Sequence, residues 1–119
     1  MKEILEKLLK KEENILFGYL FGSFATSNAK KTSDVDVALY FKEYSLDNHL
    51  DISLKISKAT KRECDLVVLN NAKNLYLLEE IITKGILLKD DKEKREMFEV
   101  VKHHDYLDFV EFKRMLNAS

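Results

Sequence analysis

The chain has 119 residues, of which 45% are hydrophobic and 34% charged, so its size and composition predict one globular domain spanning residues 1–119. The formal net charge of −1 disfavours a strong, sequence-independent grip on nucleic acid, which usually needs a basic surface. No segment has the apolar length of a signal peptide or a membrane helix, and a single cysteine excludes an internal disulfide, so we expect a cytoplasmic protein.

Helices and strands are predicted to alternate in the first third of the chain. Apolar residues at helical spacing predict a helix over 2–11, and the apolar run at 15–21 predicts a buried strand. A Gly-Ser pair ends that strand. A short helix is then expected over 23–29 and a polar loop over 30–33. Residues 34–41 point strictly to alternate faces, which indicates a second strand.

The rest of the chain continues the alternation. In order, we expect a helix from its cap Asp47 to about residue 59, a strand over 63–69, a helix from Asn71 or Asn74 to a C-terminal cap at Gly85, a strand over 86–88 and a long amphipathic helix over 91–116. This pattern predicts an α+β (α/β-like) fold, a small mixed β-sheet with helices packed on it.

The Gly-Ser pair after the first strand suits a polyphosphate. Gly22 has no Cβ, so a ligand can approach the backbone closely. The Ser23 hydroxyl and the free N–H groups of the helix expected to follow are donors for phosphate oxygens. We therefore predict nucleotide binding at Gly22 and Ser23.

Ten residues after this pair comes Asp-Val-Asp. Asp34 and Asp36 share one face of a strand, with Cα atoms about 6.5–7 Å apart. Such crowded like charges are costly unless a cation neutralises them, and Mg²⁺ prefers carboxylates plus phosphate oxygens. Two ions about 3.5–4 Å apart can clamp both the attacking and the leaving oxygen of a displacement. Asp65, a lone carboxylate in an apolar strand, joins this cluster if the two strands are neighbours, as a metal ligand or as a base.

Other candidate residues have simpler interpretations. Cys64 points away from Asp65 and is read as a core residue. His103 and His104 project about 100° apart on a helix and cannot chelate one metal together, so they are read as surface or interface residues. The lysines at 30–31 are read as part of a solvated loop.

The motifs LFGSFA and SDVDVALY, with Asp65 downstream, resemble the DNA polymerase beta nucleotidyltransferase superfamily, above all its minimal nucleotidyltransferase (MNT) branch. The late segment FEVVKHHDYLDF is similar to the tail of MNT antitoxins of HEPN/MNT toxin–antitoxin pairs. The resemblance covers nearly the whole chain. It implies an enzyme that transfers AMP from ATP, with Mg²⁺, onto a tyrosine of a HEPN ribonuclease toxin.

By position, the resemblance assigns nucleotide binding to Gly22 and Ser23 and metal binding and catalysis to Asp34, Asp36 and Asp65. One departure is clear. The family commonly has Ala-Arg-Gly after Gly-Ser-x, whereas this chain has Ala-Thr-Ser at 25–27.

Three functions are therefore open: a protein adenylyltransferase, a nucleotide-binding module that only masks its toxin, and a nucleotidyltransferase acting on a small molecule. The long C-terminal helix carries more apolar residues than one buried stripe needs, including Phe109 and Phe112. We expect part of that surface to dock the HEPN partner, with a homo-oligomer as the alternative.

Overall fold

The computed structural model describes residues 1–118, so residue 119, the end of the predicted domain, lies outside the described part. Over these residues the chain forms helices, strands and one 3₁₀ turn, which are, in order, α1 (Lys2–Lys10), β1 (Ile15–Phe21), η1 (Gly22–Phe24), β2 (Val35–Phe41), α2 (Leu46–Thr60), β3 (Cys64–Val68), α3 (Leu75–Lys84), β4 (Ile86–Lys89) and α4 (Lys92–Asn117). The α+β fold class is confirmed, and the predicted strands begin and end within one residue of the observed ones.

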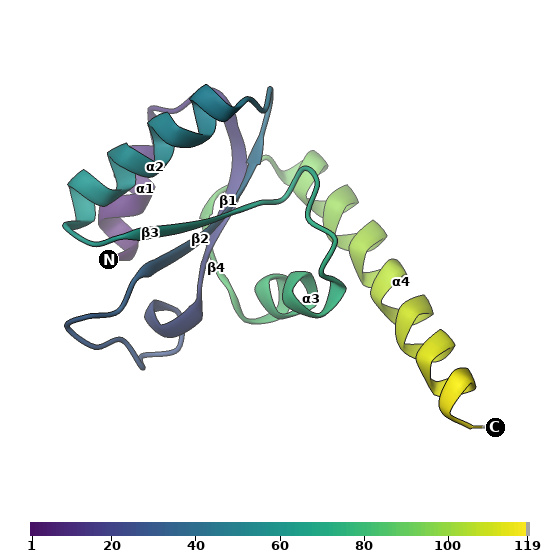
Figure 1. The fold of residues 1–119 in the computed structure, drawn as a ribbon. Helices are drawn as coiled ribbons and strands as arrows, with labels where there is room; N and C mark the ends of the chain where they lie inside the picture. Colours follow the sequence, from purple (N-terminus) through teal and green to yellow (C-terminus); the bar gives the residue numbers. More distant parts are fainter. Residues whose placement is uncertain (119) are drawn as a thin grey trace.

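The strands form one mixed sheet in the order β3-β2-β1-β4. β1 lies antiparallel to β2 and to β4, whereas β2 and β3 are parallel because α2 returns the chain between them. Figure 1 shows α1 and α2 on one face of this sheet and α3 and α4 on the other, with α4 running away from the body of the molecule.

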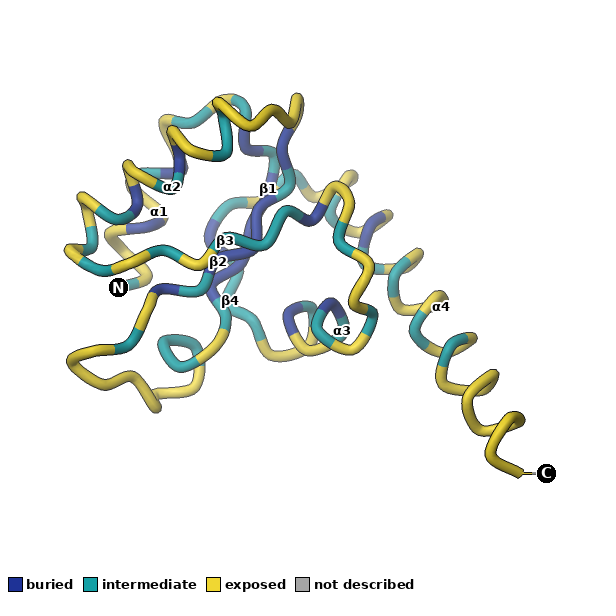
Figure 2. The backbone as a smooth tube through the Cα atoms, in the orientation of Figure 1, coloured by how far each residue is buried: buried dark blue, intermediate teal, exposed yellow. Residues whose placement is uncertain are grey.

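Strand β2 contributes side chains to both hydrophobic cores, and Figure 2 shows this strand largely buried. Val35, Val37, Leu39 and Phe41 are buried against α1 and α2. On the opposite face, Ala38 is buried in a second core, whose other buried members are Phe17, Tyr19, Leu69, Leu78, Ile81 and Phe98. The face of Ala38 is also the face of Asp36, so the predicted carboxylates lie on the α3/α4 side.

The prediction of a short helix over 23–29 is wrong, because only the 3₁₀ turn of η1 forms there. The chain leaves helical geometry at Ser27, whose φ of +62° is left-handed. The hydroxyl of Thr26 accompanies this by donating to the carbonyl oxygen of Gly22. Such local side-chain bonds compete with helix formation. The element that we predict to bind phosphate is therefore a tight turn and not the N-terminus of an α-helix.

Two helix ends also differ in detail. Ser45, and not Asp47, caps α2, since its hydroxyl accepts a hydrogen bond from the N–H of Asn48 at 3.0 Å. Asn74 caps α3 as expected. Gly85 ends α3 in an extended conformation (φ −70°, ψ 157°) and not the left-handed one that glycine caps usually adopt.

The first half of α4 is tied to the sheet by a polar chain. The hydroxyl of Tyr19, on β1, donates to Glu99 at 2.7 Å, and Arg95 pairs with both Glu99 and Asp90. Burial, reinforced by the Glu99 carboxylate, raises the pKa of Tyr19 far above its usual value, so the hydroxyl stays a donor.

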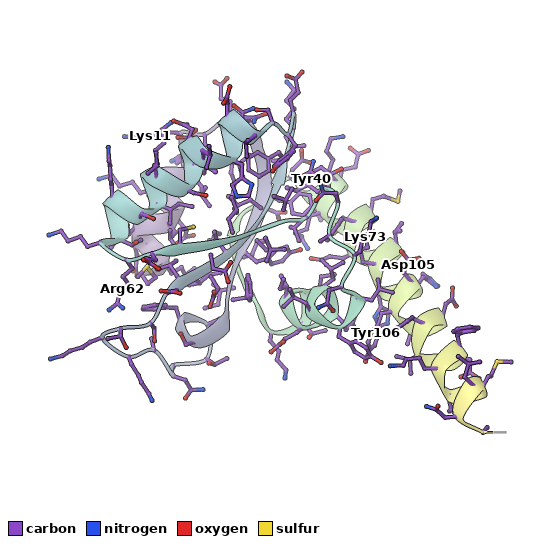
Figure 3. All side chains as sticks on the ribbon, in the orientation of Figure 1. Lys11, Tyr40, Arg62, Lys73, Asp105 and Tyr106 are labelled. Carbon is purple, nitrogen blue, oxygen red and sulfur yellow. The ribbon has the colours of Figure 1, made fainter. Side chains whose placement is uncertain are left out.

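Further along, aromatic rings join α4 to α3. The ring of Tyr76 lies 6.0 Å from that of Tyr106 and 5.6 Å from that of Phe109. Figure 3 shows Tyr106 where the two helices adjoin. Beyond this contact every described residue of α4 from 110 onward is exposed (Figure 2). No described helix is both long and apolar enough to cross a membrane.

Candidate active site

Gly22 follows β1 at the end of the sheet where β2 begins. Its φ of +73° lies in the left-handed region, which side chains other than glycine rarely adopt. A Cβ built on Gly22 would also collide with the carboxylate of Asp36. The backbone conformation therefore favours glycine here, and a side chain at this position would displace the Asp36 carboxylate.

Strand register brings two of the predicted aspartates together. Asp36 of β2 is the direct partner of Asp65 in the parallel ladder and of Phe21 in the antiparallel one. Neighbouring strands lie about 4.8 Å apart, so the two carboxylates are held side by side on the same face. Asp36 and Asp65 are thus paired across β2 and β3, and Gly22 lies beside them, directly after the β1 residue that pairs with Asp36.

The electrostatics of these carboxylates show the crowding that the sequence predicts. Partial burial raises the pKa of Asp36, and the charge of Asp65, a hydrogen bond with it and the charge of Asp34 raise it further. Asp34 precedes β2 and is exposed, as is Asp65. Asp36 is the half-buried member on which the repulsion acts.

The chemistry of this donor set fits a magnesium ion, which is commonly bound through one or two carboxylates with phosphate oxygens completing the shell. Among residues 1–118 no three His, Cys, Asp or Glu side chains are already arranged to enclose a metal. The structure thus pairs Asp36 with Asp65 closely and leaves Asp34 at their margin.

Ser23 lies within η1, next to Gly22, and is half-buried. Over the described residues its hydroxyl has no hydrogen-bond partner. The first N–H groups of a 3₁₀ turn also lack partners within the turn itself. Donors are thus available beside the carboxylates, as phosphate binding requires.

A cavity of about 270 Å³ opens beside Gly22. Sequence reasoning did not find its far wall, which comes from Glu80, Lys84 and Gly85 at the end of α3. No motif marks these residues, because only the packing of α3 against the sheet brings them to the Gly-Ser turn.

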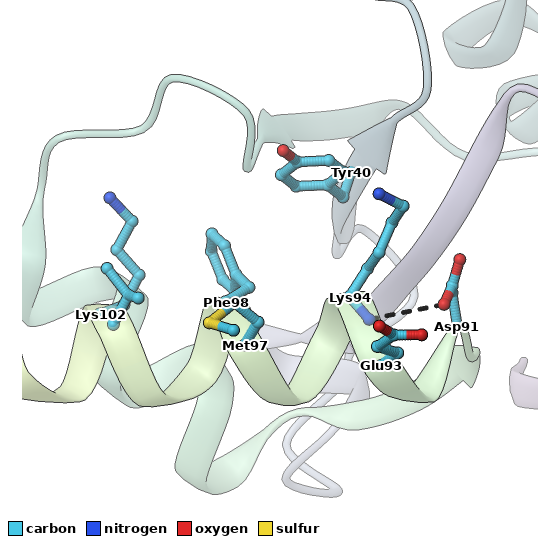
Figure 4. Close-up of a pocket in the computed structure, with 8 residues that line it drawn as sticks. Tyr40, Asp91, Glu93, Lys94, Met97, Phe98 and Lys102 are labelled. Carbon is cyan, nitrogen blue, oxygen red and sulfur yellow. Dashed lines mark hydrogen bonds between the residues drawn. The ribbon is translucent and has the colours of Figure 1, made fainter.

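A larger cavity, of about 530 Å³, lies at the opposite end of β2 (Figure 4). The ring of Tyr40 and the first turns of α4, including Phe98, Lys94 and Lys102, line it. None of the predicted site residues reaches it, so we separate it from the candidate active site.

The remaining candidates behave largely as the sequence suggests. Cys64 packs against the α1/α2 core, and burial raises the pKa of its thiol to about 11, so it is not a nucleophile at neutral pH. His103 is exposed and its Nδ1 lies 2.8 Å from Glu79 of α3, a partner that the sequence did not identify. The two lysines at 30–31 lie in an exposed loop.

With this fold and site in place, the class of the protein follows: the chain belongs to the polymerase beta nucleotidyltransferase family. The family model described as "Polymerase beta, Nucleotidyltransferase" matches residues 3–94. The resemblance expected from FGS and DVD is thereby confirmed.

Among individual proteins, the chain is 31% identical over 84 residues to the protein adenylyltransferase MntA of Shewanella oneidensis. That alignment covers 69% of this chain and 59% of MntA, so the chain spans about three fifths of its relative's length.

The fold is also similar to two solved structures. A crystal structure of a toxin–antitoxin with AMP-PNP has a TM-score of 0.80 at 23% identity, covering 98% of this chain and 96% of the other. The tri-AMPylated Shewanella oneidensis HEPN toxin in complex with its MNT antitoxin gives a TM-score of 0.73 at 22% identity, covering 99% and 98%. Both matches extend through α4 and confirm the predicted fold, including its long last helix.

Proposed function

We propose that this chain is a protein adenylyltransferase that transfers AMP from ATP onto a tyrosine of a cognate HEPN ribonuclease toxin and so neutralises it. One observation carries the proposal: a nucleotidyltransferase-family chain brings the turn at Gly22 against the paired Asp36 and Asp65 at one end of its sheet. The acceptor and the antitoxin role rest on the similarity to MntA and to the MNT antitoxin bound to an AMPylated HEPN toxin.

In the proposed reaction the tyrosine oxygen bonds to the α-phosphorus of ATP, and the bond from that phosphorus to the pyrophosphate oxygen breaks. Pyrophosphate leaves, and the proton of the tyrosine passes to a base. Ser23 and the backbone N–H groups of η1 hold the phosphates. Gly22 keeps that turn against the carboxylates.

Asp34, Asp36 and Asp65 would hold one or two Mg²⁺ ions. When bound, Mg²⁺ supplies positive charge that stabilises the charge developing on the phosphate oxygens. Asp65 is exposed and therefore open to the acceptor, so we assign to it the additional task of accepting the tyrosine proton.

A second function, neutralisation by binding alone, is kept because Thr26 and Ser27 stand where the family commonly has Arg-Gly. Both functions predict binding of the toxin, and only the first predicts AMP on it.

The test uses the double variant Asp34→Asn/Asp36→Asn. Incubation of wild type with labelled ATP, Mg²⁺ and the HEPN partner should label the partner, and the double variant should not label it while still binding it. Because the change removes crowded charge, the melting temperature without ligand should hold or rise. Asp51→Asn, which removes an exposed carboxylate of α2 on the other face of the sheet, is the matched control.

Retained transfer by the double variant would remove the carboxylates from catalysis. A partner that is bound and silenced by wild type without acquiring AMP would favour the masking function.

A further inference from the structure

Arg62 lies in the turn between α2 and β3, three residues before Asp65. Its Nη1 atom donates to three backbone carbonyl oxygens, those of Lys30, Lys31 and Ser33, at 3.1, 3.0 and 2.9 Å. All three belong to the loop that leads into β2. Figure 3 shows Arg62 between that loop and the start of β3.

The same guanidinium also reaches the other end of the loop. Its central carbon lies 4.9 Å from the centre of the Phe24 ring, a cation–π distance. Phe24 closes η1 and directly follows Ser23, while the carbonyl of Ser33 directly precedes Asp34. One side chain therefore contacts both halves of the proposed site.

The loop has little else to hold it. Residues 26–32 are exposed, so no apolar side chain there is buried in a core. Between its ends the loop has short-range bonds, such as Lys30 N–H to the Ser33 hydroxyl at 2.8 Å. Arg62 joins this loop to the turn before β3, next to the bond of 2.9 Å from the Val35 N–H to the Glu63 carbonyl. One terminal nitrogen makes all three loop contacts, while the planar guanidinium lies over the Phe24 ring.

The geometry points to Arg62 as a positioning residue: it clamps the loop between the Gly-Ser turn and Asp34 onto the start of β3, and so fixes the spacing of Ser23, Asp34 and Asp65. Arg62 acts through these residues and touches no reacting atom. The inference rests on the proposed function for its kinetic consequence and on the contacts alone for its structural one.

The structural consequence is measured with trypsin, which cleaves after lysine and arginine, by following the cuts in the loop alone. Residues 30 and 31 are both lysines in the clamped loop, so loop release exposes its own cleavage sites. We expect Arg62→Ala to be cut there about 10- to 100-fold faster than wild type, the usual range for losing a charge-assisted hydrogen bond. Arg62→Lys, which keeps the charge but loses the planar guanidinium over Phe24, should lie between the two.

Lys58→Ala, which removes an exposed cation from the last turn of α2, is the matched control and should leave this cleavage unchanged. Cleavage of Arg62→Ala at the wild-type rate would overturn the clamp.

The kinetic consequence is a loss in rate and in magnesium affinity. We expect kcat for AMP transfer to fall about 10- to 100-fold in Arg62→Ala, since small misplacements of site groups have effects of that size. The Mg²⁺ concentration for half-maximal rate should be lowest in wild type, higher in Arg62→Lys and highest in Arg62→Ala. Faster cleavage with unchanged kcat and Mg²⁺ requirement would show a clamp without a positioning role.

A separate measurement distinguishes failure of the proposed function from failure of the role inferred for Arg62. If wild type transfers no AMP to the toxin, calorimetry of Mg²⁺-ATP binding replaces the rate. A weaker affinity in Arg62→Ala together with faster cleavage then supports the inference, and an unchanged affinity overturns it.

Discussion

The ionisation of Asp36 depends on its burial and on the neighbouring aspartates of the candidate site. Partial burial and the neighbouring Asp65 raise its pKa in the folded protein. Folding therefore favours its protonated form. The resulting stability is fully present below the pKa of the unfolded chain and is lost as the pH rises through the raised pKa of the folded state.

This linkage predicts that the difference in melting temperature between Asp36→Asn and wild type depends on pH. Above the raised pKa the variant lacks the repelled charge, so its melting temperature should exceed that of wild type by a few degrees. Below the unfolded pKa both side chains are neutral and the difference should shrink. Calorimetric melting across a pH series checks this, and a wild type more stable than the variant at neutral pH would contradict it.

The same pKa predicts how ligand affinity depends on pH. Mg²⁺ binds the ionised carboxylate, so the Mg²⁺-dependent affinity for ATP in wild type should fall as the pH drops through the raised pKa of Asp36. Titration calorimetry at several pH values measures it. An affinity that does not vary with pH in this range would mean that Asp36 is not a ligand.

Asp65→Asn separates the two roles assigned to that residue. With Asp34 and Asp36 still present, the affinity for Mg²⁺-ATP should be largely kept, while the transfer rate falls by about 10²–10⁴-fold, as is usual when a general base is lost. Binding and single-turnover rate are measured on the same preparation. If both fall together, Asp65 is an essential metal ligand instead.

The sequence could single out the candidate site residues but not all of the contacts between them. Strict alternation of 34–41 places Asp34 and Asp36 on one face, and a lone charge in an apolar strand singles out Asp65. The pairing of Asp36 with Asp65 depends on parallel register between β2 and β3, which no local pattern encodes. Arg62 left no signal because its acceptors are backbone carbonyls.

At the level of elements, helices and strands with strong periodicity were predictable, and the element between β1 and β2 was not. Ala, Thr and Ser at 25–27 tolerate a helix, but hydroxyl-to-backbone bonds and the left-handed Ser27 end it after one 3₁₀ turn. The long helix was predictable over its length, whereas its attachment through Tyr19, Glu99 and Arg95 joins residues far apart in the sequence.

That attachment can be weighed by Tyr19→Phe, which deletes only the hydroxyl. Glu99 keeps its pairing with Arg95, so no buried charge loses every partner and the cost should be about 1 kcal/mol. Urea unfolding measures it. Tyr44→Phe removes a hydroxyl that bonds His49 on the surface and should change the free energy of unfolding by less than about 0.5 kcal/mol. Equal effects would mean that the α4 attachment carries no special stability.

On the scale of the whole molecule, α4 carries more apolar side chains than it packs against its own domain. The structure separates two phenylalanines that the sequence groups together. Phe109 is half-buried against Tyr76, whereas Phe112 is 58% exposed. The expectation that part of the helix stays apolar and exposed is confirmed, but Phe109 contributes to internal packing.

Phe112→Ser is therefore expected to weaken binding of the HEPN partner while leaving the melting temperature and Mg²⁺-ATP affinity unchanged. Phe109→Ser is the comparison, because it should lower the melting temperature by loosening α4 from α3. Partner and nucleotide are titrated separately against each variant. Unchanged partner affinity in Phe112→Ser would place the docking surface elsewhere.

Because Asp36 pairs with Asp65 across parallel strands, the site depends on the register between β2 and β3. Because side chains alternate along a strand, a slip of β3 by a single residue would bring Cys64 to the site and turn the Asp65 carboxylate into the α1/α2 core. A slip by two would restore the face but offer Asp36 a different neighbour. A change of one residue in the length of β3, which has only five residues, would therefore be expected to remove the Asp65 carboxylate from the site.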